Sequence, residues 1–329
     1  MYSKSIFGLG ALLALAAGFP AAAQQIEVLP VQGNIHVISG AGGNITVQAG
    51  PEGVLLVDTG LAASAAGVLA EIRKLSTAPV FYIINTHVHA DHVGGNEAVA
   101  QTRSGQNGAL IPTGGGGRIE LLDGVQPLKI IAHENVLNRM TTKKGGEAPA
   151  SELGLPEDEY FTPFKDLRFN GEAIIIYHEP NAHTDGDSVV LFRGSDVVST
   201  GDIFTPEGYP FIDIERGGSI EGEVAALDHI LDLTVPGKTQ EGGTYVIPGH
   251  GRVCDEADVV EFRDMVVIIR DRIKDMIKKG MTLDQVKAAR PSLDYDTEYV
   301  KPASFIKADQ FVEAIYKSLT QAKNGGSTK

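Results

Sequence analysis

The amino-acid sequence predicts an α/β fold followed by a helical extension at the C-terminus. Short runs of β-branched residues, bounded by Gly and Pro, alternate with stretches of helical spacing as far as residue 252. Beyond that point the spacing of apolar residues is helical. With 43% hydrophobic and 21% charged residues, the chain has the composition of a globular protein that buries a core.

The N-terminal part of the fold is expected to begin with strands. Residues 34–39, 44–48 and 54–58 are rich in β-branched and aliphatic residues and are separated by turns that contain Gly and Pro. Residues 61–75 change to helical spacing, and residues 80–85 form a continuous apolar run. We therefore expect a helix and then a strand that is buried on both faces.

The middle of the chain is expected to be less regular before strands resume. Residues 134–168 are rich in Gly, Pro and charge, which favours an insertion near a cleft. Further strands are expected at 173–179, 188–192, 196–200 and 244–248.

The C-terminal region is expected to be helical. Residues 257–279 carry apolar residues at helical spacing and stop at Gly280, and Thr282 has a side chain suited to an N-cap. The helix after Thr282 should end near Arg290, which precedes a proline, and residues 305–319 should form the last helix.

The first residues are expected to be a secretory leader. Residues 1–23 begin with a positive charge, continue with an apolar run too short to span a bilayer, and end in three alanines. We expect a Sec-type signal peptide cleaved after Ala23, no stable membrane anchor, and a periplasmic or extracellular destination. The mature chain, 24–329, should be one domain with a core at about 34–252 and the helical extension at 255–329.

Composition excludes some classes of function. The chain has 42 acidic and 28 basic residues and a net charge of −14, which argues against nucleic-acid binding because that function needs a basic surface. Its one cysteine, Cys254, excludes an internal disulfide framework and a zinc site made of several thiolates.

The histidines are clustered in a pattern typical of metal ligands. Of the nine, His87, His89 and His92 lie within one hexapeptide that follows the apolar run at 80–85 and that also contains Asp91. Residues two apart on a loop can point to one side, so His87 and His89 can converge on one ion. Asp91 and His92 can turn towards a second, since imidazole and carboxylate are ordinary zinc ligands.

These motifs resemble those of the metallo-β-lactamase-fold hydrolases. The resemblance continues with the segments 181–187, 199–202 and 247–251, which place His183, Asp202 and His250 next to expected strands, and with 57–60. It implies a four-layer αββα metallo-β-lactamase-type sandwich with a binuclear metal site at one edge of the sheets. The ligand set is similar to that of the glyoxalase II and lactonase branches.

The resemblance also implies which residues hold which metal. One ion would be bound by three histidines, the other by an aspartate and two histidines, and Asp202 would bridge them. Asp91 would additionally be catalytic, orienting the nucleophile and moving its proton. We expect two Zn²⁺ ions, and iron or manganese fit the same groups. The ligands would be His87, His89 and His183 for one ion and Asp91, His92 and His250 for the other.

Three further residues are candidates for supporting roles. Asp58 is either an acceptor for the ring N–H of a ligand histidine or a cap for the loop after its strand. Tyr209 either donates a hydrogen bond to a leaving group or is an aromatic residue at the rim of the site. His133 either approaches the cleft or has a structural role.

The expected activity is that of a secreted binuclear zinc hydrolase. A metal-bridging hydroxide would attack the carbonyl centre of a small ester, lactone or lactam, and the partner is thus a small-molecule substrate. The alternatives are a β-lactamase proper, a phosphoester or thioester hydrolase, and an iron-dependent redox protein on the same scaffold. Asp202 stands where lactamases that use a thiolate have cysteine, which argues against antibiotic hydrolysis. The sequence leaves the oligomeric state open.

Overall fold

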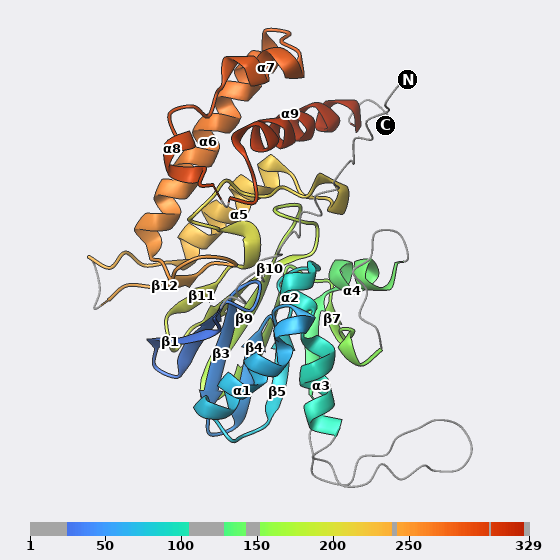
Figure 1. Cartoon of the computed structure of the whole chain (residues 1–329), viewed down its shortest axis with the longest axis vertical. Coiled ribbons are helices and arrows are strands. Elements are labelled where there is room, and N and C mark those ends of the chain that lie inside the picture. Colours follow the sequence, from blue (N-terminus) through green and yellow to red (C-terminus); the bar gives the residue numbers. More distant parts are fainter. Residues whose placement is uncertain (1–24, 105–127, 143–151, 239–241, 303, 326–329) are drawn as a thin grey trace, which may run out of the picture.

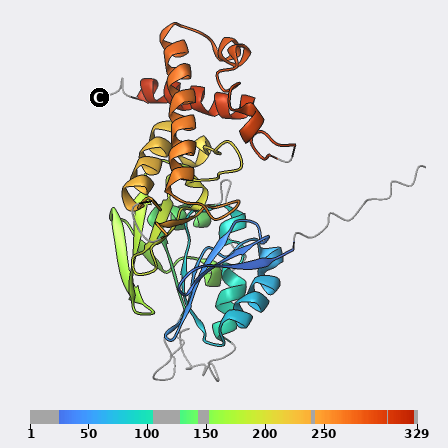
Figure 2. The ribbon, with the colours of Figure 1, turned by 90° about the vertical axis from the view of Figure 1, so that its left-hand side faces the viewer.

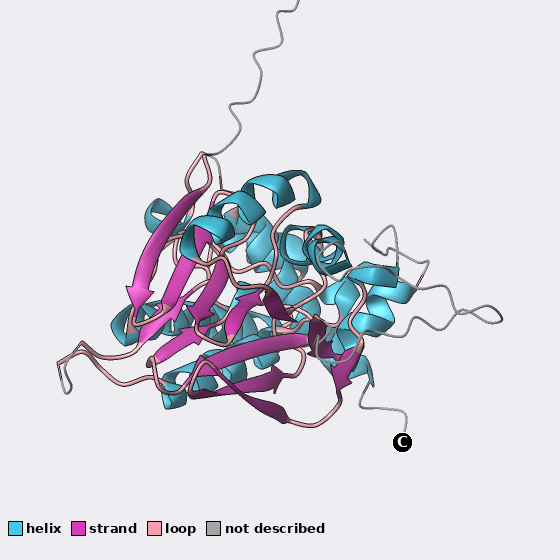
Figure 3. Ribbon diagram, turned by 90° about the horizontal axis from the view of Figure 1, so that it is seen from below, coloured by secondary structure: helices cyan, strands magenta, loops and turns pink. Residues whose placement is uncertain are grey.

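The computed structural model in Figure 1 describes residues 25–104, 128–142, 152–238, 242–302 and 304–325. The expected signal peptide, 1–23, lies outside the described residues. Two β-sheets pack face to face in the described part of the chain, with helices on their outer faces, and Figure 3 shows the strands as two facing layers.

The first sheet has seven strands that follow one another in chain order. They are β1 (Glu27–Gln32), β2 (Ile35–Ser39), β3 (Ile45–Gly50), β4 (Gly53–Val57), β5 (Val80–Ile84), β6 (Lys129–His133) and β7 (Asp158–Tyr160). Neighbours are antiparallel from β1 to β4 and parallel from β4 to β7. Parallel neighbours require crossover connections, which contain α1 (Ala65–Leu75) after β4 and α3 (Asn96–Ser104) after β5.

The second sheet has five strands in the order β12-β11-β10-β9-β8. They are β8 (Phe164–Phe169), β9 (Glu172–Glu179), β10 (Asp187–Phe192), β11 (Val197–Ser199) and β12 (Tyr245–Ile247). Strands β8 to β11 form an antiparallel meander, whereas β11 and β12 are parallel and are connected through α5 (Ile220–Leu233).

Alternation along the strands supplies separate apolar cores. Leu55 and Val57 of β4 face the second sheet and share a core with Ile176 of β9. Leu56, between them, points to the opposite face and packs in a core with Val68 of α1. A third core joins the outer face of the second sheet to α5. The expected four-layer αββα sandwich is therefore confirmed.

The expected C-terminal helical extension is also present. Its helices are α6 (Glu256–Lys278), α7 (Leu283–Ala289), α8 (Asp296–Tyr299) and α9 (Ala308–Gly325). Figures 1 and 2 show them stacked above the sheets, and α5, α6 and α9 contribute to one apolar core. Thr282 caps α7 as expected, in a reciprocal pair with Gln285. None of the helices in the described residues has the length and apolar character needed to cross a membrane.

The structure differs from the sequence expectation in the middle of the chain. The supposed insertion contains α4 (Glu134–Thr141), β7 and β8, and α5 was not predicted. Strand β8 was missed because charged residues interrupt its apolar ones and half of its residues are exposed, as suits an edge strand. The last helix begins at Ala308, so Phe305 precedes it.

Candidate metal centre

The seven candidate ligands lie at one edge of the two sheets. His87 and His89 follow the end of β5, and Asp91 and His92 belong to the short helix α2 (Ala90–Val93) directly after them. The other three lie in the second sheet's loops, because β11 and β12 end at this edge and the antiparallel strand β10 begins there. These are His183 before β10, Asp202 after β11 and His250 after β12.

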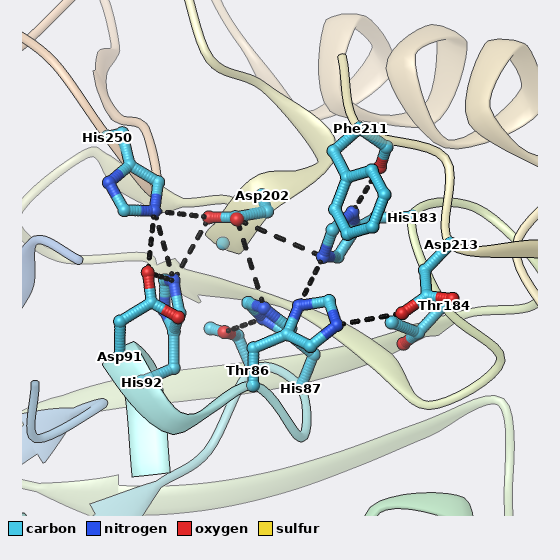
Figure 4. Close-up of polar contacts among 12 residues, drawn as sticks. Thr86, His87, Asp91, His92, His183, Thr184, Asp202, Phe211, Asp213 and His250 are labelled. Carbon is cyan, nitrogen blue, oxygen red and sulfur yellow. Dashed lines mark hydrogen bonds and ion pairs between the residues drawn. The ribbon is translucent and has the colours of Figure 1, made fainter. Parts of the chain in front are cut away.

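The structure brings the ligands together as two groups, which Figure 4 shows side by side. In the first group, His89 Nδ1 lies 2.9 Å from His183 Nε2, and the ring centroids of His87 and His183 are 4.6 Å apart. The first group consists of His87, His89, His183 and Asp202, and the second consists of Asp91, His92 and His250.

The second group is equally close. His250 Nε2 lies 3.4 Å from His92 Nε2 and 3.2 Å from Asp91 Oδ2. In both groups polar atoms with lone pairs converge within 4.8 Å of one another. Such convergence would be unfavourable without a shared cation or proton, so it is the geometry expected of metal ligands.

Asp202 lies between the groups. Its Oδ1 is 3.1 Å from His92 Nε2 and 3.4 Å from His250 Nε2, whereas Oδ2 is 3.8 Å from His183 Nε2 and 3.9 Å from His87 Nε2 (Figure 4). One oxygen thus faces each group, which is the arrangement that a bridging carboxylate needs.

Two glycines allow these side chains to approach the backbone closely. A Cβ on Gly249 would lie 2.0 Å from Asp202 Oδ1, and a Cβ on Gly43 would lie 2.5 Å from the ring of His92. Any larger residue at either position would displace a ligand, so both positions require glycine.

The buried rings of His87 and His92 are each fixed through Nδ1, the nitrogen opposite the one that faces the ligand groups. His92 Nδ1 lies 2.8 Å from Asp58 Oδ2, and His87 Nδ1 lies 3.0 Å from the hydroxyl of Thr86. Asp58 also accepts hydrogen bonds from the backbone N–H and the hydroxyl of Thr86. Asp58 therefore contacts a ligand histidine, which is one of its two expected roles, whereas its hydrogen bonds to Thr86 hold the loop after the neighbouring strand β5 and not the loop after its own strand.

The first group is held by residues that the sequence did not reveal. His89 Nε2 lies 2.9 Å from Asp213 Oδ2, and the same oxygen accepts a hydrogen bond of 2.8 Å from Arg216. His183 Nδ1 donates to the carbonyl oxygen of Phe211. Asp213 comes between two isoleucines and belongs to no motif, so only its position in the structure identifies it.

The charge states of His87, His183 and Asp202 suit a cation. Burial lowers the pKa of His87 well below its ordinary value and that of His183 to about 4, so both rings stay neutral and keep a lone pair. Burial would raise the pKa of Asp202, but His92 and His250 hold it well below its ordinary value. The Asp202 carboxylate is therefore ionised.

One further observation supports the fit of a metal ion. Among the residues that the structure describes, His87 Nε2 is one of the few buried polar atoms without a hydrogen-bond partner. Leaving a buried nitrogen unpaired is costly, and coordination to a cation would satisfy it. The donor set of imidazole and carboxylate fits two zinc ions.

A cavity of about 630 Å³ opens onto the centre. Four of the ligands contribute to its lining: His89, Asp91, Asp202 and His250. The rings of His87, His92 and His183 are buried beneath them. A small molecule in the cavity can thus reach both groups.

Tyr209 and His133 lie apart from the ligands in different ways. The ring of Tyr209 lines the cavity, but its hydroxyl donates to the extension, at Ser292 O and Asp296 Oδ1, and is buried there. This geometry argues against a hydrogen bond to a leaving group. His133 caps α4 and stacks on His178 with ring centroids 3.5 Å apart, so the structure gives it a structural position.

Comparisons with known proteins agree with this geometry. A family model described as the metallo-beta-lactamase superfamily matches residues 38–236, which is more than half of the chain. The chain is 26% identical over 277 residues to a linear primary-alkylsulfatase from Pseudomonas sp. (strain ATCC 19151), a match that covers 72% of this chain and 47% of the relative. The chain thus spans about half the length of that curated relative.

Solved structures show the same fold. The stereoselective inverting sec-alkylsulfatase Pisa1 from Pseudomonas sp. is similar with a TM-score of 0.65 and 16% identity, over 89% of this chain and 50% of that chain. A metallo-beta-lactamase from Pontibacter korlensis is similar with a TM-score of 0.54 and 16% identity, over 74% of this chain and 99% of that chain. Both sheets, the strand-end motifs and the family match lead to one conclusion: the chain belongs to the metallo-β-lactamase superfamily.

Proposed function

We propose that this protein is a metal-dependent hydrolase that cleaves ester bonds with the help of two zinc ions. The observation that carries the proposal is the position of Asp202, whose two oxygens face two separate ligand groups beneath one cavity. A site built only for stability would be closed, whereas this one leaves space for a substrate. The alkylsulfatase name of the curated relative adds sulfate esters to the carboxylic esters expected from the sequence.

The chain's own residues prepare the site for this reaction. Two divalent cations in these positions would supply water as a nucleophile at neutral pH and balance the negative charge that develops on the substrate. Asp213 and Asp58 hold the rings of His89 and His92 in the tautomer that turns a lone pair towards the centre. Asp91 reaches the cavity with a side chain that is 33% exposed, so it can hold and transfer a proton of the attacking water.

Metal analysis combined with a hydrolysis screen tests the proposal. Purified protein should contain about two zinc ions per chain, as expected for a binuclear site. It should cleave aryl esters, lactones or alkyl sulfates, and a chelator should abolish turnover until zinc is restored. Nitrocefin, an aryl phosphate and a thioester in the same panel distinguish the alternative hydrolases, and oxygen reduction by an iron-loaded form would indicate the redox alternative.

Two variants make the test specific. His87→Ala should lose metal and activity, because His87 belongs to the first group and its Nε2 has no described hydrogen-bond partner that could take the place of a metal. His229→Ala is the matched control, since His229 pairs with Glu179 and belongs to neither group. Full activity of the His87 variant, or a metal-free active wild type, would refute the proposal.

We also propose that residues 1–23 direct secretion. Mass spectrometry of the protein exported by a bacterial host should then find Gln24 as the first residue. A chain that stays in the cytoplasm at full length would contradict this proposal.

A further inference from the structure

The C-terminal extension contributes to the cavity above the metal centre. The segment between α8 and α9 places Ser304, Phe305 and Ile306 in the lining, together with Leu61 and Phe211 from the sandwich. Phe305 is 80% exposed and Leu61 is 40% exposed. Large apolar side chains that remain exposed within a concave site indicate that a ligand covers them.

Aromatic rings form a continuous wall from the metal centre outwards. The ring of Phe211 stacks on the ligand His89, with centroids 5.8 Å apart, and meets the edge of Phe305 at 5.6 Å. Figure 4 shows Phe211 beside His183, with which it makes an edge contact at 5.6 Å. Phe305, the most exposed of these rings, lies at the solvent side of the wall.

Leu61 supplies apolar surface next to the other ligand group. Leu61 Cγ and Asp91 Cβ lie 2.9 and 3.0 Å from the position that a Cβ on Gly42 would take, so these two side chains are neighbours. Each ligand group is thus flanked by an apolar side chain that lines the cavity.

The charged groups of the lining are confined to a few positions. Apart from the metal ligands, the lining includes one acidic residue, Glu207, and one basic residue, Arg216, among the residues described. Arg216 donates to Asp213 Oδ2, which in turn contacts the ligand His89. The cavity therefore combines a polar end at the metal centre with an apolar side formed in part by the extension.

We infer that the site takes esters that carry an alkyl chain, and that Phe305 of the extension determines the preferred length of that alkyl chain. The inference rests on the proposed function for the position of the ester group. The alkyl chain of the substrate would lie along Phe211 and Phe305, with Leu61 and Ile306 available as further apolar contacts. Each methylene that is buried should strengthen binding about fourfold, until the chain extends beyond Phe305.

A binding experiment tests the inference without turnover. Butyl-, hexyl- and octylsulfonate are suitable probes because their C–S bond offers no ester oxygen to hydrolyse. Calorimetry with the zinc-loaded protein should show affinity rising by about fourfold per methylene, with a heat-capacity change that becomes more negative as the chain lengthens.

Variants of Phe305 identify the residue responsible. Phe305→Ala should weaken octylsulfonate binding by about tenfold and leave butylsulfonate nearly unchanged, whereas Phe305→Leu should keep most of the affinity. Because Phe305 is exposed, neither substitution should disturb folding. Phe161→Ala is the matched control, since Phe161 is 74% exposed and is not part of the cavity lining.

The outcomes separate this inference from the proposed function. Equal affinity for all three sulfonates, or equal losses in the Phe305 and Phe161 variants, would overturn the inference. In a series of p-nitrophenyl esters from acetate to octanoate, kcat/KM should rise with chain length in the wild type and much less in Phe305→Ala. Sulfonate binding that depends on chain length, without hydrolysis of any ester or sulfate, would refute the function and leave the alkyl site standing.

Discussion

Asp213 provides a sharp test of how the metal centre is held. Its side chain is buried, and Oδ2 lies 2.9 Å from His89 Nε2 and 2.8 Å from the Arg216 guanidinium. Its Oδ1 accepts the backbone N–H of Arg216 at 3.0 Å. Since His89 turns Nδ1 towards the first ligand group, the ring proton belongs on Nε2, where the Asp213 carboxylate accepts it.

The substitution Asp213→Asn removes this acceptor with little change in shape. If the amide oxygen keeps the bond to the Arg216 backbone, the amide nitrogen faces two donors, His89 Nε2 and the guanidinium. When a metal-binding histidine loses the carboxylate that accepts its ring N–H, metal affinity typically falls 10- to 100-fold, which corresponds to about 1.4 to 2.7 kcal/mol. We expect a loss of that size for one of two zinc ions, with a parallel fall in kcat/KM.

Chelator competition on the zinc-loaded protein measures the affinity, and denaturant unfolding confirms that the variant is folded. Asp255→Asn is the matched control, because Asp255 caps α6 as Asp213 caps a short helical turn, Ile214–Arg216. Unchanged zinc affinity in Asp213→Asn, or an equal loss in the control, would show that Asp213 does not position His89.

Three further predictions address the bridge, the cavity and the extension. Asp202→Ala should lose both zinc ions and His250→Ala only one, measured by elemental analysis, and two retained ions in Asp202→Ala would contradict the bridge. Tyr209→Phe should lower the free energy of unfolding by about 1 to 2 kcal/mol, because the buried hydroxyl bonds to the extension, and should leave kcat unchanged. A fall in kcat without loss of stability would instead support a role in the reaction. Hydrogen bonds from Lys287 and Lys317 lower the pKa of Glu313 from 4.5 to about 2. Because the folded-state pKa is the lower one, the ionised Glu313 stabilises the fold above pH 4.5, and this contribution is lost as the pH falls towards 2. Thermal unfolding should therefore separate wild type from Glu313→Gln at pH 6 but not near pH 2, and a constant difference would refute this linkage.

The sequence carried much of the information about the candidate centre because the ligands follow strands. The spacing of His87, His89, Asp91 and His92 after a buried strand is a local pattern, and the end of a strand fixes where such a loop lies. The continuous apolar run at 80–85 likewise predicted a strand with two buried faces, and in β5 Ile84 and Ile83 do belong to the cores on opposite faces.

Other features had no local signal. Asp213 makes its contact with a residue 124 positions away, so nothing near it in the chain marks its role. The mixture of charged and apolar residues in β8 is as compatible with a loop as with an edge strand. Tyr209 illustrates the reverse problem, because its closeness in sequence to Asp202 left two roles open, a hydrogen bond to a leaving group or an aromatic ring at the rim, and the direction of its hydroxyl argues against the first.

The sequence by itself determined the fold class, the helical extension and the set of side chains able to bind metal. The fold class and the extension follow from residue type and short-range periodicity, which act within one strand, loop or helix. The set of candidate ligands rests on local motifs and on their resemblance to the motifs of a known family. Only the tertiary structure decided which ligands form each group, which residues fix their rings, and that the extension reaches the cavity with Phe305. These features depend on how two sheets and a distant helical segment pack, and packing is set by the shapes of surfaces that are remote from one another in the chain.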